Sequence, residues 1–246
     1  MYNAFAEVYD RLQDADYAKI ADYYEHIFEK YGIKPELVLD LACGTGNITV
    51  PMSQRGYDMI GVDLSVEMLN IAREKAQAAG QNILFLNQDM TEFELYGTVD
   101  AILCALDGVN YLTADGETDE LFRLAENYLN PGGLMIFDIN TEYKLREVLG
   151  SNTFVNEEQG IYYVWRNDFS EKTRICSFEL NFFRETEDGT YERFDEYQEE
   201  RAYSADELIQ SATAAGLVAK GVFSPFTFEN AKEKEERIFI VLSKKK

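Results

Sequence analysis

The first 140 residues alternate between short apolar runs and longer stretches in which apolar residues recur every three or four positions. Short apolar runs are typical of buried strands, and the longer period is typical of helices that cover a sheet. This alternation predicts a parallel β-sheet with helices on its faces. The predicted strands are Leu37–Leu41, Met59–Asp63, Ile83–Asn87, Val99–Leu106 and Leu134–Ile139.

Two helices between these strands are predicted most clearly. The first opens at Ser65, closes at Gly80, and has an apolar face made of Met68, Leu69, Ala72, Ala76 and Ala79. The second stops at Asn130-Pro131-Gly132-Gly133, and its apolar face is Leu121, Leu124, Ala125, Tyr128 and Leu129. The N-terminal segment to about Tyr31 also has a helical pattern. Together these elements predict a doubly wound α/β core.

The pattern changes between residues 151 and 202, where apolar and polar residues alternate. Asp188-Gly189 separates two such runs and is typical of a hairpin turn. We interpret this region as an antiparallel meander of about three strands, inserted into a core that comprises residues 1–150 and 203–246. The alternating apolar positions are Ile161, Tyr163, Trp165 and Phe169, followed by Cys176, Phe178, Leu180 and Phe182.

The helical pattern returns after the meander. Ser204 and Glu207 have the spacing of a capping box, and the helix is expected to end at Gly216. Two last strands, about Val218–Phe228 and Arg237–Ser243, are predicted to form a hairpin that closes a seven-stranded sheet.

Composition limits the functions that this core can have. The chain has 45 acidic and 23 basic side chains, a net charge of −22, which opposes encounter with a phosphate backbone. We therefore expect no nucleic-acid partner. No apolar run approaches the ~20 residues that cross a bilayer, and the first residues lack signal-peptide features, so we expect a cytoplasmic protein without a membrane partner. The cysteines lack metal-site spacing, and no metal is expected.

Three turns after predicted strands carry the chemistry. The first, Asp40 to Gly46, contains an acid followed by Gly44 and Gly46, which allow the backbone to approach a ligand closely. The second ends in Asp63, a carboxylate suited to accept hydrogen bonds from a ribose diol. In the third, Asp89 can accept from an exocyclic amine and Met90 can lie against an adenine ring. Together the turns describe an adenosine site.

The identity of the adenosine ligand follows from the first turn. A nicotinamide dinucleotide uses G-x-G-x-x-G, but Thr49 stands where the third glycine would be. Asp40 would sit poorly beside a pyrophosphate and well beside the amino group of an amino acid. These residues favour S-adenosylmethionine over NAD.

The chain here resembles the class I S-adenosylmethionine-dependent methyltransferases. The resemblance covers residues 36–140 by motif, the final helix and strands, and the N-terminal segment Phe5 to Asp10. Ala42 replaces the usual first glycine of the first motif. The resemblance implies a Rossmann-like fold, S-adenosylmethionine as methyl donor, and an N-terminal segment that closes over it. The cofactor-binding residues we expect are Tyr9, Tyr17, Asp40, Ala42, Gly44, Gly46, Asp63, Leu64, Met68, Asp89, Met90 and Leu106.

The acceptor is predicted to be held after the fourth strand. Asp107 could deprotonate or hold an ammonium, Asn110 could orient the acceptor, and Tyr111 could form a pocket wall; alternatively, these residues only cap and end the strand. The layout resembles bacterial glycine, sarcosine and sugar-amine N-methyltransferases, which implies a small-molecule acceptor and favours an amine. The base-methylating sequence N-P-P-Y or D-P-P-Y is absent.

Two questions stay open at this stage. The insert, with thirteen acidic and six basic residues from Ser151 to Tyr203, is either an acceptor wall or a sheet that packs on the core or pairs across a homodimer. A protein that binds S-adenosylmethionine without catalysis, as a sensor or regulatory module, would carry the same cofactor motifs. Turnover with a set of acceptors separates the enzyme from the sensor.

Overall fold

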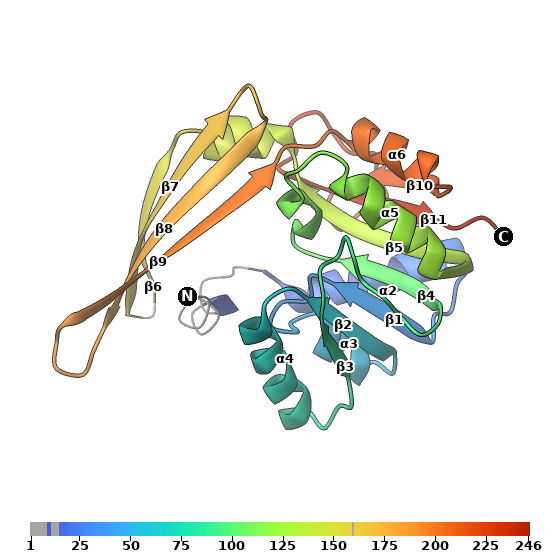
Figure 1. The fold of residues 1–246 in the computed structure, drawn as a ribbon, viewed down its shortest axis with the longest axis horizontal. Coiled ribbons are helices and arrows are strands. Elements are labelled where there is room, and N and C mark those ends of the chain that lie inside the picture. The colour runs from blue at the N-terminus through green and yellow to red at the C-terminus, as the bar shows by residue number, and fades with distance from the viewer. Residues whose placement is uncertain (1–8, 11–14, 159) are drawn as a thin grey trace.

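The computed structural model describes residues 9–10, 15–158 and 160–246. Their strands form a seven-stranded mixed sheet and a separate four-stranded antiparallel sheet, which lies to the left of the core in Figure 1. The order in the larger sheet is β10-β11-β5-β4-β1-β2-β3. Strands β1 to β5 run parallel to one another, and β11 is antiparallel to β5. These strands are β1 (Leu37–Leu41), β2 (Asp58–Asp63), β3 (Leu84–Asn87), β4 (Val99–Cys104), β5 (Leu129–Asn140), β10 (Val218–Phe223) and β11 (Arg237–Ser243).

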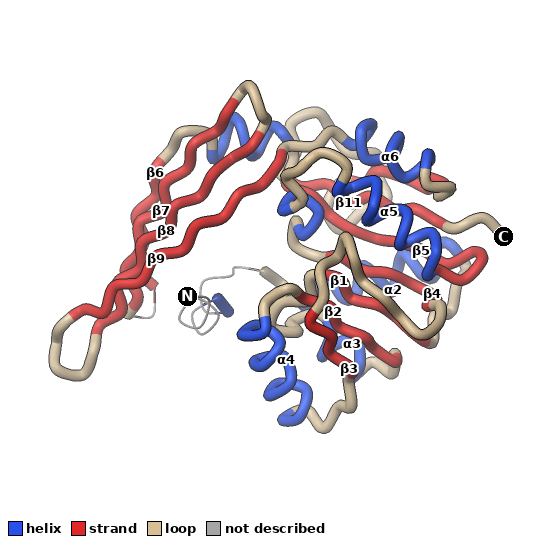
Figure 2. Tube along the Cα trace, viewed as in Figure 1, coloured by secondary structure: helices blue, strands red, loops and turns tan. Residues whose placement is uncertain are grey.

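Helices cover both faces of the seven-stranded sheet (Figure 2). Successive side chains of β5 show why its sequence is apolar throughout, since Met135 and Phe137 pack with one set of helices and Leu134 and Ile136 with the other. The first set is α5 (Glu117–Tyr128) and α6 (Ala205–Ala214), and the second includes α2 (Tyr17–Tyr31) and α3 (Thr49–Gln54). The predicted Rossmann-like, doubly wound fold is therefore confirmed.

Helix ends follow the predicted capping signals. Ser65 caps α4 (Val66–Ala78) by accepting from the Met68 N–H at 3.2 Å. Ser204 and Glu207 form both hydrogen bonds of a capping box at the start of α6. The first of these caps matters for the site, because it fixes where α4 begins relative to Asp63.

Three strand boundaries differ by two or more residues from those predicted. The fourth strand ends at Cys104 because Leu106 and Asp107 adopt left-handed backbone angles, φ 54° and 58°. The fifth begins at Leu129, since the Asn-Pro-Gly-Gly segment pairs with β4 across a bulge instead of forming a loop. The tenth ends at Phe223, where the chain turns before Phe226 at φ 60°.

The insert forms four strands in the described structure, so the prediction of about three was wrong. The additional strand, β6 (Thr153–Glu158), is an edge strand whose positions are mostly exposed, and it therefore has no apolar alternation to reveal it. It pairs with β7 (Ile161–Ser170), which pairs with β8 (Ile175–Glu185), which pairs with β9 (Tyr191–Arg201). The Gly189 turn joins the last two strands at φ 78°.

The insert contacts the core at both of its ends. At the end where the chain passes between the core and the insert, Cys176 and Phe178 pack with Leu145 and Leu149 of a π-helical segment, η2 (Lys144–Leu149). Farther along, Ile161 and Phe182 pack against Met68 of α4 and against Tyr9. Figure 1 shows the four-stranded sheet extending away from the core on its left side.

Cys43, Cys104 and Cys176 are buried, free thiols. Among the described helices, none is long and apolar enough to span a membrane.

Candidate active site

A cavity of about 700 Å³ lies at the carboxyl ends of the parallel strands. Open α/β sheets bind ligands at this edge, and the volume is within the range of small-molecule sites. Its walls come from the N-terminal residues Tyr9 and Tyr17, the loops after β1, β2, β3 and β4, and strand β9 of the insert. The three turns that the sequence singled out therefore meet in one cavity.

Asp40, near the end of β1, is the most deeply buried acid in the cavity wall. Its side chain accepts from Oγ1 of Thr49 at 2.6 Å, and the residue is 1% exposed. Burial raises the pKa of Asp40 to about 7, opposed by the Thr49 hydrogen bond and assisted by the charge of Asp63. A cationic amino group in the cavity would stabilise the ionised form of this carboxyl.

Asp63 joins the first and second turns. Its Oδ2 accepts from the Gly44 N–H and its Oδ1 from the Ser65 N–H, both at 2.8 Å. Burial raises the pKa of Asp63, while these two hydrogen bonds lower it. Each carboxylate oxygen can accept a second hydrogen bond, so the side chain can hold the two loops and a ribose diol together.

The glycines of the first turn have different roles. Ala42 and Gly44 line the cavity, with φ 54° and 53°. Gly46 does not line the cavity, although we expected it to bind the cofactor. A Cβ at Gly46 would lie 3.1 Å from the Cβ of Ala72 in α4, so this glycine permits close packing of that helix.

The other expected cofactor residues reach the cavity from four elements. Leu64 and Met68 lie after β2 and in α4, Asp89 and Met90 follow β3, and Leu106 follows β4. Asp89 Oδ1 is occupied by the N–H and the hydroxyl of Thr91, at 2.8 and 2.7 Å. This pair of hydrogen bonds fixes the Asp89 carboxylate at the wall.

The N-terminal segment is tied to the first turn by Asp10, a residue that we did not predict for the site. Asp10 accepts from Thr45 Oγ1 at 2.6 Å and Asn47 Nδ2 at 2.7 Å, and forms an ion pair with Lys75 at 2.5 Å. Burial opposes ionisation, but these partners lower the pKa of Asp10. Its place directly after Tyr9, at the end of the N-terminal segment that the resemblance covers, was the available sequence signal.

Tyr9 and Tyr17 both line the cavity. Burial raises the pKa of both phenols. The Tyr17 hydroxyl is buried beside Asn47 and has no hydrogen-bond partner of normal geometry among the described residues. A buried hydroxyl of this kind is suited to a polar ligand group. Together with Asp40 and Asp63, it makes a donor and acceptor set that fits an amino acid joined to an adenosine.

The expected acceptor residues divide into two groups. Asp107 and Tyr111 line the cavity, but Asn110 does not. The Asn110 amide is fully buried and bridges the Asn140 backbone, donating to its carbonyl and accepting from its N–H, both at 3.0 Å. It also donates to the Arg201 carbonyl at 2.9 Å. Asn110 thus joins β5, β9 and the loop after β4, and both polar atoms of its amide are engaged in backbone hydrogen bonds.

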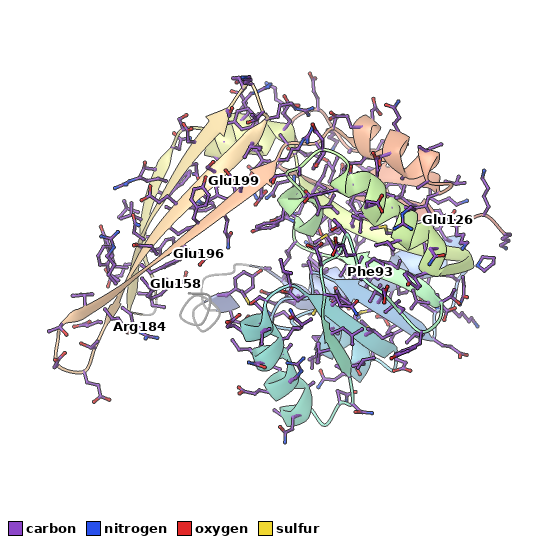
Figure 3. The ribbon with its side chains drawn as sticks, viewed as in Figure 1. Phe93, Glu126, Glu158, Arg184, Glu196 and Glu199 are labelled. Carbon is purple, nitrogen blue, oxygen red and sulfur yellow. The ribbon has the colours of Figure 1, made fainter. Side chains whose placement is uncertain are left out.

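Strand β9 contributes residues that the sequence pattern did not indicate. Tyr197, Gln198 and Glu199 line the cavity, and Gln198 Oε1 accepts from the Tyr111 hydroxyl at 3.0 Å. Figure 3 shows Glu199 and Glu196 on the insert, apart from Phe93 in the core. The alternation along β9 predicted a strand, but no local signal says which long-range surface a strand faces.

Comparisons with known proteins agree with this geometry. A family model described as a methyltransferase domain matches residues 38–133. The chain is 33% identical to a putative methyltransferase from Geobacillus sp. (strain WCH70), over 99% of both chains. The crystal structure of an S-adenosylmethionine-dependent methyltransferase from Clostridium acetobutylicum is also 33% identical, with a TM-score of 0.91 over 100% of this chain and 99% of that one.

A more distant structure shares the fold. S-adenosylmethionine-bound CalS10, an amino pentose methyltransferase from Micromonospora echinaspora, is 21% identical, with a TM-score of 0.77 over 99% of this chain and 98% of that one. The cavity and these similarities define the class of protein as a methyltransferase with a Rossmann-like core. The chain belongs to the S-adenosylmethionine-dependent methyltransferases, and it is an enzyme that uses S-adenosylmethionine as methyl donor. The expectation of this cofactor is confirmed.

Proposed function

We propose that the enzyme methylates an amine of a small-molecule acceptor, held between the loop after β4 and strand β9. The charge of the cavity carries this proposal. Among its described lining residues seven are acidic and none is Lys, Arg or His; the acids are Asp40, Asp63, Glu67, Asp89, Asp107, Glu117 and Glu199. Such a wall attracts a cationic acceptor and repels an anionic one.

Six of the seven acids fall into a cofactor group and an acceptor group, and the seventh, Glu67, lies in the first turn of α4. Asp40, Asp63 and Asp89 belong to the three cofactor turns, whereas Asp107, Glu117 and Glu199 lie with Tyr111 on the elements nearest the insert. We assign the second group to the acceptor. The insert is then an acceptor wall, with the core of residues 1–150 and 203–246 providing the cofactor site.

S-adenosylmethionine supplies a methyl group already activated on a sulfonium, so the protein needs no nucleophile. The residues of this chain have to orient the acceptor nitrogen, exclude water and hold the positive charge of the amine. Orientation of this kind can supply up to ~7–11 kcal/mol of the barrier. With S-adenosylmethionine bound, the acceptor ammonium would first lose a proton to solvent; the neutral nitrogen would then form the N–CH3 bond as the S–CH3 bond breaks and S-adenosylhomocysteine leaves.

Three further observations support a small amine. The net charge of −22 opposes nucleic-acid binding. The cavity volume of about 700 Å³ suits the cofactor with one small acceptor. CalS10, which shares the fold, is described as acting on an amino pentose.

The test is production of S-adenosylhomocysteine with a panel of amino sugars, amino acids and diamines, each beside its hydroxyl analogue, and with RNA and DNA. We expect the amines to be methylated fastest. Asp107→Asn should reduce transfer by a larger factor than it changes S-adenosylhomocysteine affinity. Asp115→Asn is the matched control, since that carboxylate is exposed beside the same loop but outside the cavity.

Faster methylation of hydroxyl analogues or nucleic acid would contradict the amine proposal. Cofactor binding without turnover of any acceptor would contradict it in favour of a sensor.

A further inference from the structure

The loop after β4 contains two consecutive residues, Leu106 and Asp107, in the left-handed region, at φ 54° and 58°. The left-handed backbone conformation is strained for residues other than glycine. Asp138 of β5 accepts from both of their backbone N–H groups, the first to Oδ1 at 2.8 Å and the second to Oδ2 at 3.1 Å. The carboxylate of Asp138 therefore holds this strained turn, and the turn directs the Asp107 side chain to the cavity wall.

Arg237, the first residue of β11, reaches the same place from the other side. Its Nη2 donates to Oδ1 of Asp107 at 2.5 Å and to Oδ1 of Asn140 at 3.2 Å, and its Nη1 donates to Oδ2 of Asp138. Backbone register explains the reach, because Arg237 pairs with Asn140 at the end of β5. Oδ2 of Asp107 takes no hydrogen bond from the described residues, so it is the oxygen available to a ligand.

Asp107 belongs to a cluster of ionisable side chains. Three carboxyl groups, Asp107, Asp138 and Glu200, are joined to two cations, Arg237 and Lys144, through direct contacts or through Asn140. Asp138 and Glu200 are 1% and 4% exposed. Asp107 is the member of this cluster at the cavity, and Arg237 is the cation paired with it.

We propose that Arg237 is a positioning residue for methyl transfer, which aims one oxygen of Asp107 at the acceptor. This inference rests on the proposed function, in which the acceptor amine contacts Asp107. An Asp107 carboxylate bound to a guanidinium is a hydrogen-bond acceptor that orients the amine.

The other titratable groups near Asp107 favour Arg237 as its charged partner. Burial opposes the charge on Arg237, but Asp138 and Asp107 outweigh burial and raise the pKa of its guanidinium. Burial lowers the pKa of Lys144 and raises the pKa of Glu200. The remaining titratable groups that interact with Asp107 are the phenols of Tyr9 and Tyr111 and the thiol of Cys104.

Two substitutions separate charge from geometry. Arg237→Gln removes the cation, so the adjacent carboxyls should take up a proton and the acidic limb of the kcat/KM profile should move to higher pH. Arg237→Lys keeps the cation but cannot contact Asp107 and Asp138 with two separate nitrogens. We therefore expect kcat to fall, on the order of 10²-fold, while the pH of the acidic limb changes little. The affinity for S-adenosylhomocysteine should change less than threefold in either variant.

Arg174→Gln is the matched control. Arg174 also bridges two carboxylates, Glu142 and Glu207, and is similarly part-buried, but it lies outside the cavity. Its loss should lower stability without moving the pH profile. If wild type methylates amines while Arg237→Gln behaves as Arg174→Gln does, the positioning role is overturned and the proposed function stands.

A second measurement does not depend on the acceptor. Urea unfolding of Arg237→Gln should show stability falling between pH 5.5 and 8, because the protonated carboxyl favoured in its folded state is lost as pH rises. Arg237→Gln/Asp138→Asn should lose less over the same range, because burial raises the pKa of Asp138 and Arg237 lowers it. Parallel curves of stability against pH for the two variants would overturn the positioning role, whether or not any amine is methylated. A failure to methylate any amine would by itself overturn only the proposed function.

Discussion

The Gly44 N–H donates to Oδ2 of Asp63 at 2.8 Å, so the acid proposed for the ribose also holds the loop after β1. We therefore expect substitutions at Asp63 to change two things, the contacts to the ligand and the shape of the first turn.

We predict that Asp63→Ala weakens S-adenosylhomocysteine binding by about 2–4 kcal/mol, because charged hydrogen bonds to ribose hydroxyls are lost. Asp63→Asn keeps one acceptor oxygen and should lose less. Calorimetry measures both affinities. Equal affinity in wild type and both variants would place the ribose elsewhere.

The two glycines of the first turn should respond differently to alanine. The Cβ of Gly44→Ala would lie on the cavity wall with no other atom within 4 Å. The Cβ of Gly46→Ala would lie 3.1 Å from the Cβ of Ala72. Both pay about 1–2 kcal/mol for a left-handed alanine. We expect Gly46→Ala to lower the thermal midpoint further and Gly44→Ala to weaken cofactor binding more.

Gly32→Ala supplies the control for this pair. Gly32 ends α2 at φ +67° with nothing within 4 Å of a Cβ, and it lies outside the cavity. It should show the left-handed cost alone. A Gly44→Ala variant with unchanged cofactor affinity would argue against close backbone approach at that turn.

Much of the core and of the cofactor site was predictable because its signals are local. Apolar runs, the capping residues Ser65 and Ser204, and strand-ending acids each occupy a few neighbouring positions, and a parallel sheet brings strand ends to one edge. Arg237 and Gln198 were not predictable. Their roles depend on which strand β11 pairs with and on which way β9 faces, and these are long-range choices.

Cofactor affinity should depend on pH through Asp40. Its pKa is about 7, so the carboxylate that would bind the amino group of the cofactor is increasingly protonated below that pH. S-adenosylhomocysteine affinity should fall as pH decreases from 8 to 6. Thr49→Val removes a hydrogen bond that lowers this pKa, and should move the midpoint to higher pH.

The same shift has the opposite sign for the stability of the apo protein. Because the folded pKa of Asp40 lies above the unfolded value, its contribution to stability is complete at low pH and is lost as pH rises through about 7. Asp40→Asn should therefore be relatively more stable than wild type at pH 8 while binding cofactor less tightly. A cofactor affinity that stays flat from pH 6 to 8 would refute the role of the ionised Asp40.

The hydrogen bond from Tyr111 to Gln198 at 3.0 Å joins the loop after β4 to the insert, and its removal should affect the acceptor more than the cofactor. We predict that Tyr111→Phe raises the acceptor KM by roughly two- to tenfold, since one such bond contributes about 0.5–1.5 kcal/mol. Gln198→Leu should have a similar effect, and the double variant should cost less than the sum of the two because both remove the same contact.

Tyr31→Phe is the control, because its hydroxyl donates to the Lys220 carbonyl at 3.1 Å outside the cavity. Steady-state kinetics with the best amine of the panel gives the values. Additive losses in the double variant would show that the two side chains act separately, and the insert would then shape the acceptor site without this link.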